Sequence, residues 1–135
     1  MEISASLVVE LTHRAREASM HAYVPYSNFA VGAAVLTREG QIYAGANVEN
    51  ASYGLSMCAE RSAIFQAVAH GARSIRAIAV YTPTAATTPP CGACRQVMTE
   101  FGTDVLVICC CDDANAQRRY ALAELLPLPF GPAHL

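Results

Sequence analysis

The chain has 135 residues, 53% of them hydrophobic and 15% charged, with a formal net charge of -2. This length fits a single domain over residues 1–135, and the high apolar content excludes a disordered chain. The mild acidity argues against a nucleic-acid partner, because such proteins usually carry a concentrated basic surface. We find no apolar stretch long enough to span a membrane and no pattern typical of a secretory signal, so we expect a cytoplasmic protein.

Hydrophobic spacing alternates between helical and strand periods along the sequence. In chain order it predicts a helix over 5–22, strands over 29–37 and 41–46, a helix over 58–70, a strand over 75–81, a helix over 92–101, a buried strand over 105–111, an edge strand over 116–120 and a helical turn over 122–126. Strands that alternate with helices indicate a layered α/β domain, in which the two middle helices cross from strand to strand.

Three of the six cysteines lie at the starts of the two middle helices. Cys91 and Cys94 form a Cys-x-x-Cys pair within Pro90-Cys91-Gly92-Ala93-Cys94, and Cys58 precedes them by 33 residues. Helix N-termini stabilise thiolates, because unpaired backbone N–H groups and the helix dipole favour negative charge. If the two helix starts lie side by side on one sheet, the three sulfurs can bind one zinc ion.

Three protein ligands leave the fourth position of a tetrahedral zinc site open to water, whose pKa the metal lowers. This is the pattern of a catalytic zinc site, whereas a structural site normally has four protein ligands. A structural zinc site and a redox dithiol remain alternatives for the Cys-x-x-Cys pair.

Charged side chains accompany the cysteines at both helix starts. Glu60 lies two residues after Cys58, near enough to the metal to exchange protons without binding it. Arg61 and Arg95 are placed to donate hydrogen bonds to the thiolates and to offset their charge. Taken singly, each of these three residues also fits an ordinary solvated position on a helix.

The remaining cysteines and the histidines give no metal-binding pattern. Cys109, Cys110 and Cys111 fall within an apolar run, where cysteine packs as a small hydrophobic residue. The four histidines have no ligand spacing and are expected at the surface or at helix ends.

Four ordered motifs resemble those of the cytidine deaminase family, in its short form with three cysteine ligands. They are Tyr26-Ser27-Asn28-Phe29-Ala30-Val31-Gly32-Ala33-Ala34, Asn47-Val48-Glu49-Asn50, Cys58-Ala59-Glu60-Arg61 and Pro90-Cys91-Gly92-Ala93-Cys94-Arg95-Gln96. The known zinc deaminases carry a His-x-Glu…Pro-Cys-x-x-Cys signature, with cysteine in place of histidine in the three-cysteine variant. The resemblance extends from about Ala15 to Phe130. It implies a three-layer α/β/α fold with a central mixed sheet of about five strands.

The resemblance also implies roles for individual residues. Cys58, Cys91 and Cys94 match the ligands of one zinc ion per subunit, and Glu60 matches the proton shuttle. The residues that match substrate contacts are Asn47 and Glu49 for the ribose hydroxyls, Phe29 and the backbone of Ala59 for the pyrimidine, and Tyr53 and Phe130 for a neighbouring subunit's site. Without the resemblance, Phe29 also fits a core strand, and Asn47 and Glu49 also fit a turn.

The implied function is hydrolytic deamination of cytidine and deoxycytidine in pyrimidine salvage, by a homotetramer whose sites are completed by neighbouring subunits. One alternative is a deaminase for another aminopyrimidine, such as a cytosine-containing antibiotic. A second is a zinc-stabilised binding module without activity, which requires a fourth protein ligand. A third, action on bases in nucleic acid, is disfavoured by the net charge of -2.

Overall fold

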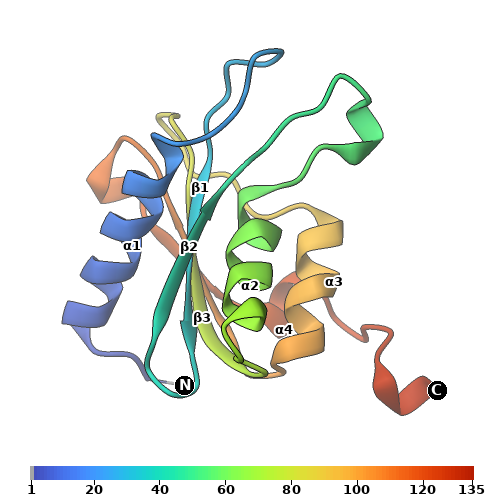
Figure 1. Cartoon of the computed structure of the whole chain (residues 1–135). Coiled ribbons are helices and arrows are strands. Elements are labelled where there is room, and N and C mark those ends of the chain that lie inside the picture. Colours follow the sequence, from blue (N-terminus) through green and yellow to red (C-terminus); the bar gives the residue numbers. More distant parts are fainter. Residues whose placement is uncertain (1) are drawn as a thin grey trace.

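The computed structural model describes residues 2–135 and places a five-stranded mixed sheet between two layers of helices (Figure 1). The strands are β1 (Gly32–Thr37), β2 (Ile42–Ala46), β3 (Ile75–Tyr81), β4 (Leu106–Cys110) and β5 (Arg118–Ala121), in the spatial order β2-β1-β3-β4-β5. The helices are α1 (Ala5–Ser19), α2 (Ala59–Ala69), α3 (Gly92–Phe101) and the short α4 (Leu122–Leu125). The predicted α/β class and the mixed sheet of about five strands are confirmed.

The pairing of the strands follows from their connections. β1 pairs antiparallel with β2, to which the short turn at 38–41 connects it. On its other side β1 pairs antiparallel with β3, which follows α2 in the chain. β3 and β4 are parallel, which requires a crossover connection, and α3 supplies it. β4 and β5 are antiparallel. The starts of α2 and α3 therefore lie at the same edge of the sheet, as the sequence pattern predicted.

Each face of the sheet is covered by different helices. Val8, Leu11 and Ala15 of α1 pack on one face, and the residues of α2, α3 and α4 pack on the other. Such a three-layer arrangement buries strands on both faces, which explains the largely apolar sequences of β1, β3 and β4.

Small residues allow the helices to approach the sheet closely. A Cβ atom at Gly32 would lie 1.8 Å from the carbonyl oxygen of Ala15, and one at Gly45 would lie 2.5 Å from the backbone nitrogen of Ala63. Neither position accepts a side chain without displacement of a helix. The contact at Gly45 sets α2 against the edge strand β2, and this places the start of α2 over the sheet.

Some predicted boundaries are wrong by a few residues. The first strand begins at Gly32 rather than at residue 29, so Phe29 lies in a loop and not in a core strand. The reason is the side-chain amide of Asn47, which binds the backbone of residues 29 and 31 and replaces strand pairing there. The first helix ends at Ser19 rather than at residue 22.

Candidate functional site

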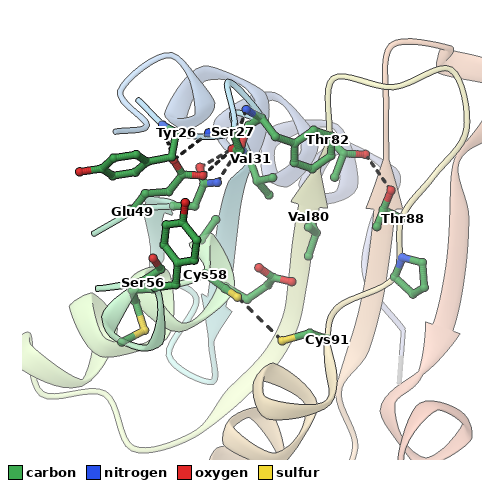
Figure 2. Close-up of a pocket in the computed structure, with 17 residues that line it drawn as sticks. Tyr26, Ser27, Val31, Glu49, Ser56, Cys58, Val80, Thr82, Thr88 and Cys91 are labelled. Carbon is green, nitrogen blue, oxygen red and sulfur yellow. Dashed lines mark hydrogen bonds between the residues drawn. The ribbon is translucent and has the colours of Figure 1, made fainter. Parts of the chain in front are cut away.

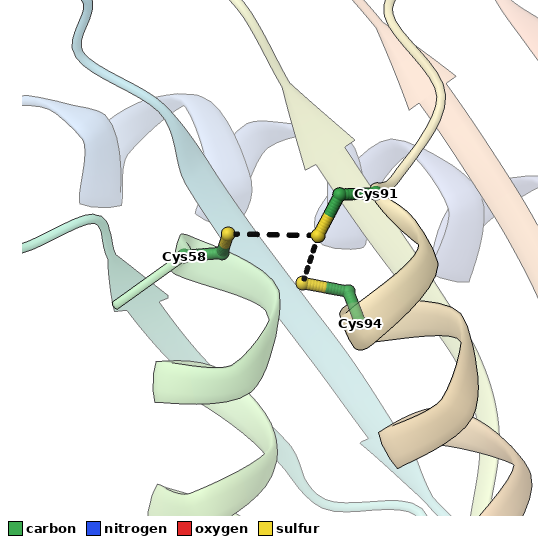
Figure 3. A group of neighbouring side chains, drawn as sticks. All are labelled: Cys58, Cys91 and Cys94. Atoms are coloured by element: carbon green, nitrogen blue, oxygen red, sulfur yellow. Dashed lines mark hydrogen bonds between the residues drawn. The ribbon is translucent and has the colours of Figure 1, made fainter. Parts of the chain in front are cut away.

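Three sulfur atoms meet where α2 and α3 begin (Figure 3). Cys58 and Cys91 are the residues that precede the first turns of α2 and α3, and Cys94 lies within the first turn of α3. The Sγ atoms of Cys58 and Cys91 are 3.8 Å apart, and those of Cys91 and Cys94 are 3.5 Å apart. All three sulfurs lie within 4.8 Å of one another.

The spacing and chemistry of this sulfur cluster fit a zinc ion. Tetrahedral zinc with Zn–S bonds of about 2.3 Å places its sulfur ligands about 3.8 Å apart. Across residues 2–135, the group contains no fourth histidine, cysteine or carboxylate ligand. The set therefore has the three-ligand composition of a catalytic site, and it lacks the fourth protein ligand that a structural site requires.

Arg61 is the basic group that contacts the sulfur cluster. Its Nη2 donates a hydrogen bond to Sγ of Cys58 at 3.3 Å. The hydrogen bond from Cys94 and the neighbouring Arg61 lower the pKa of the Cys58 thiol to about 5. The same contact with Cys58 raises the pKa of Arg61 above its ordinary value. The cluster therefore favours a thiolate even before a metal binds.

Arg95 does not make the contact with sulfur that its sequence position suggested. In the part of the chain that the structure describes, its guanidinium donates to the carbonyl oxygens of Pro90, at 2.7 Å, and Leu125, at 2.8 Å. Both acceptors are backbone groups at the ends of segments, where carbonyls lack helical or strand partners. Arg95 thus joins the loop before Cys91 to the end of α4.

A cavity of about 610 Å³ opens beside the sulfur cluster (Figure 2). Its volume lies in the range of small-molecule sites. Of the substrate-contact and catalytic positions predicted from the sequence, those that line it are Phe29, Asn47, Glu49, Tyr53, Ala59 and Glu60. The structure thus brings together residues that are up to 31 positions apart in the sequence.

Glu60 is a carboxyl group at the inner wall of this cavity. It lies in the first turn of α2 and its side chain is buried, with 5% of the residue exposed. Burial raises the pKa of Glu60 to about 7, because a carboxylate loses hydration there. A carboxyl group with a pKa near neutrality is suited both to accept and to donate protons.

Asn47 and Glu49 also line this cavity and hold the loop that carries Phe29. The amide of Asn47 accepts from the N–H of Val31 at 2.9 Å and donates to the carbonyl of Phe29 at 2.8 Å. Glu49 accepts from the N–H of Tyr26 at 3.0 Å and from the hydroxyl of Ser27. The hydrogen bond from Ser27 is the main cause of the lowered pKa of Glu49.

Phe130 is the one predicted substrate-contact residue that does not line this cavity. It lies in the C-terminal segment and is 61% exposed. Its carbonyl accepts from the side chain of Gln96 at 2.8 Å, and its ring stacks on His134 with centroids 5.4 Å apart. The ring is therefore available at the surface.

Several lining residues were not singled out from the sequence. Ser27, Thr82 and Thr88 contribute hydroxyl groups to the cavity wall. Ser27 belongs to the first motif, and Thr82 directly follows β3 at the sheet edge where sites commonly form. Its position at the end of a predicted strand is the sequence feature that could have identified Thr82 as a site residue.

Cys109, Cys110 and Cys111 lie apart from the sulfur cluster and pack in or beside β4. Cys109 and Cys111 are buried, and burial raises the pKa of the Cys109 thiol to about 12. Their predicted role in packing is confirmed for Cys109, which lies in the core against α2 and α3. All four histidines are exposed, as predicted.

Comparison with known proteins identifies the family. Residues 6–110 match the family described as cytidine and deoxycytidylate deaminase zinc-binding region. The chain belongs to the cytidine deaminase family. Its zinc-binding residues are Cys58, Cys91 and Cys94, as the sequence motifs predicted.

Named relatives cover nearly the whole chain. A cytidine deaminase from Sporosarcina psychrophila is 42% identical over 128 residues, which cover 95% of this chain and 94% of the relative. A cytidine deaminase from Mycobacterium tuberculosis is 43% identical over 121 residues, covering 90% and 87%. The crystal structure of cytidine deaminase from Burkholderia pseudomallei superposes with a TM-score of 0.87 at 44% identity, covering 95% of this chain and 100% of that one. The cytidine-deaminase-like fold is thereby confirmed.

No helix within residues 2–135 is both long enough and apolar enough to cross a membrane.

Proposed function

We propose that this protein is a single-domain, zinc-dependent enzyme that hydrolyses cytidine and deoxycytidine to uridine and deoxyuridine, with release of ammonia, in pyrimidine salvage. The observation that carries the proposal is the three-sulfur cluster beside a cavity whose inner wall contains the buried Glu60. The family membership and the named relatives support the same reaction.

Cys58, Cys91 and Cys94 would hold a zinc ion, which when bound would lower the pKa of a water molecule so that the water can act as a nucleophile at neutral pH. Glu60 accepts a proton from this water and delivers it to N3 of the pyrimidine, which makes C4 more electrophilic. After water has added to C4, Glu60 moves the proton of the new hydroxyl group to the amino group. The C4–N bond then breaks and ammonia leaves. One carboxyl group thus acts as base and acid in turn.

Other residues that line the cavity supply the groups that hold the nucleoside. Asn47 and Glu49 bind the ribose hydroxyls, because an amide can donate to a hydroxyl and a carboxylate can accept from it. Phe29 packs against the pyrimidine, and the backbone of Ala59 binds a polar atom on its edge. The exposed rim position of Phe29, with 39% of the residue accessible, supports contact with a ligand rather than a core role.

We further propose that the enzyme works in the cytoplasm as a homotetramer. Phe130 then reaches the site of a neighbouring subunit, and Tyr53, which also lines the cavity of its own chain, does the same. Both are large apolar side chains with most of their surface exposed, 76% for Tyr53 and 61% for Phe130. Exposed aromatic residues of this kind are typical of surfaces that become covered on association.

The test is the ultraviolet absorbance of cytidine incubated with purified protein, together with a direct assay of released ammonia. We expect absorbance to fall while ammonia accumulates in equal amount, and a strong zinc chelator to stop both. Restoration by added zinc distinguishes metal loss from denaturation. Absence of ammonia release from cytidine and deoxycytidine by zinc-loaded protein would refute the proposal.

A further inference from the structure

The hydroxyl group of Ser27 lies beside the carboxylate of Glu49 (Figure 2) and also binds the backbone of Phe29. Its Oγ accepts a hydrogen bond from the N–H of Phe29 at 3.0 Å. An ionised carboxylate can only accept hydrogen bonds, so Ser27 must donate its single hydroxyl hydrogen to Oε2 of Glu49. The Phe29 N–H therefore holds the oxygen of Ser27 in place while its hydrogen is directed at Glu49.

The other oxygen of the Glu49 carboxylate is held as well. Oε1 accepts from the N–H of Tyr26 at 3.0 Å and from the N–H of Ser27 at 3.2 Å. With both oxygens bound to one short segment, the carboxylate cannot rotate freely. Hydrogen bonds to the charged form also keep the pKa of Glu49 below its ordinary value, and the Ser27 hydroxyl is the largest cause.

The segment that carries Ser27 is itself preformed. Asn28 adopts a left-handed backbone conformation with φ of 59°, which asparagine tolerates better than most residues. Its N–H donates to the carbonyl of Val24 at 3.0 Å and closes the turn. The direction of the Ser27 hydroxyl is thus set by local backbone geometry before any ligand binds.

We propose that Ser27 is a positioning residue, which fixes the Glu49 carboxylate in the orientation that binds a sugar hydroxyl and thereby favours nucleosides that carry this hydroxyl. The inference rests on the proposed function, in which Glu49 binds the ribose. A carboxylate that is already oriented loses less conformational freedom on binding, so the hydroxyl contact contributes more affinity. Because Ser27 acts through Glu49, its effect depends on the substrate having the hydroxyl group.

The experiment compares cytidine with 2′,3′-dideoxycytidine, which lacks the 2′- and 3′-hydroxyls of the ribose and keeps the 5′-hydroxyl. We expect Ser27→Ala to lower kcat/KM for cytidine about tenfold, mainly through KM, as for loss of a hydrogen bond to a charged group. The change for the dideoxynucleoside should be less than about twofold, since an interaction that this substrate cannot make is not lost. Ser27→Thr, which keeps a hydroxyl group, should restore most of the activity toward cytidine.

Two further variants separate this role from a general effect on structure. Adding Ser27→Ala to Glu49→Gln should change the kinetics of cytidine little further, because the two residues act as one unit. Ser74→Ala is the matched control, since the Ser74 hydroxyl is also hydrogen-bonded, to Arg38 at 3.1 Å, but lies just before β3 and away from the cavity. It should leave the kinetics of both substrates unchanged.

The outcomes distinguish the two claims. If wild-type protein deaminates cytidine and Ser27→Ala reduces kcat/KM equally for both substrates, or for neither, the positioning role is wrong while the proposed function stands. If zinc-loaded wild-type protein does not deaminate cytidine, the proposed function fails, and the inference falls with it.

Discussion

The guanidinium of Arg61, in the first turn of helix α2, donates a hydrogen bond at 3.3 Å to Sγ of Cys58, the residue that precedes this turn. Three thiolates on one divalent zinc give a net charge of about -1, which weakens the ability of the metal to acidify water. A cation bound to one sulfur withdraws part of that charge. The contact therefore couples the start of α2 to the chemistry of the cavity.

We expect Arg61→Gln to retain zinc but to lower kcat for cytidine roughly 10- to 100-fold, the usual effect of removing a partner of a metal ligand. The measurement combines steady-state kinetics with zinc content per chain. Arg118→Gln, on the exposed edge strand β5, is the control and should keep the wild-type kcat and zinc content. An Arg61 variant with wild-type kcat and zinc content would contradict the role.

Substitution of Glu60 tests the proton transfers separately from metal binding. Glu60→Gln keeps the size of the buried side chain but can neither accept nor donate the proton, so kcat should fall roughly 10²- to 10⁴-fold. Zinc content should remain as in the wild type, because Glu60 does not belong to the sulfur cluster. Glu10→Gln, on α1, serves as the control. Near-normal turnover by the Glu60 variant would exclude it as the proton shuttle.

Removal of one sulfur tests the metal site. Cys91→Ala should lose most of its zinc and its activity together, since two remaining thiolates bind the ion far less tightly. Cys110→Ala removes a thiol that donates to the carbonyl of Val80, at 3.4 Å, and lies outside the sulfur cluster, so this variant should keep one zinc per chain. The measurement is the zinc content per chain of each variant after gel filtration. Equal zinc in the two variants would contradict the assignment of Cys91.

The tight contact between α1 and β1 gives a prediction about stability. A methyl group at Gly32 would lie 1.8 Å from the carbonyl oxygen of Ala15 and 2.6 Å from the nitrogen of Ser19. Gly32→Ala should therefore lower the free energy of unfolding by at least about 2 kcal/mol, as expected for overpacking of a rigid contact. Gly131→Ala, where an added Cβ meets nothing within 4 Å, should change it by less than about 0.5 kcal/mol. Urea denaturation of both variants provides the comparison, and similar midpoints would show that α1 can shift without loss.

Local patterns in the sequence predicted the elements and the sulfur cluster. The cysteines could be placed together because helix starts after parallel strands share one edge of the sheet. The features that the sequence patterns did not predict depend on tertiary contacts between segments that are far apart in the chain. The target of Arg95 depends on Leu125, 30 residues away, and the start of β1 depends on the Asn47 amide. Ser27 and Glu49 are 22 residues apart and lie in two irregular segments, one before β1 and one after β2, so no periodicity predicts their contact.

Sharing of sites between subunits can be tested by mixing two defective variants. Phe130→Ala should retain zinc and lose part of its activity, because its exposed ring is proposed to complete a neighbour's site. When it is dissociated and reassembled with Glu60→Gln chains, hybrid oligomers contain some sites with Glu60 from one subunit and Phe130 from another. These sites are intact, so the mixture should be more active than the average of the two variants assayed alone.

The control for this mixing experiment is reassembly of Glu60→Gln with Cys91→Ala chains. Glu60 and the zinc ligand Cys91 both belong to the site of one and the same subunit. A Glu60→Gln subunit therefore lacks the proton shuttle, and a Cys91→Ala subunit lacks the metal. No intact site can form, so activity should stay at the background level. Recovery in the Phe130 mixture alone, measured by ammonia release, would establish that the aromatic residue acts between chains. Recovery in neither mixture would place its function within its own subunit.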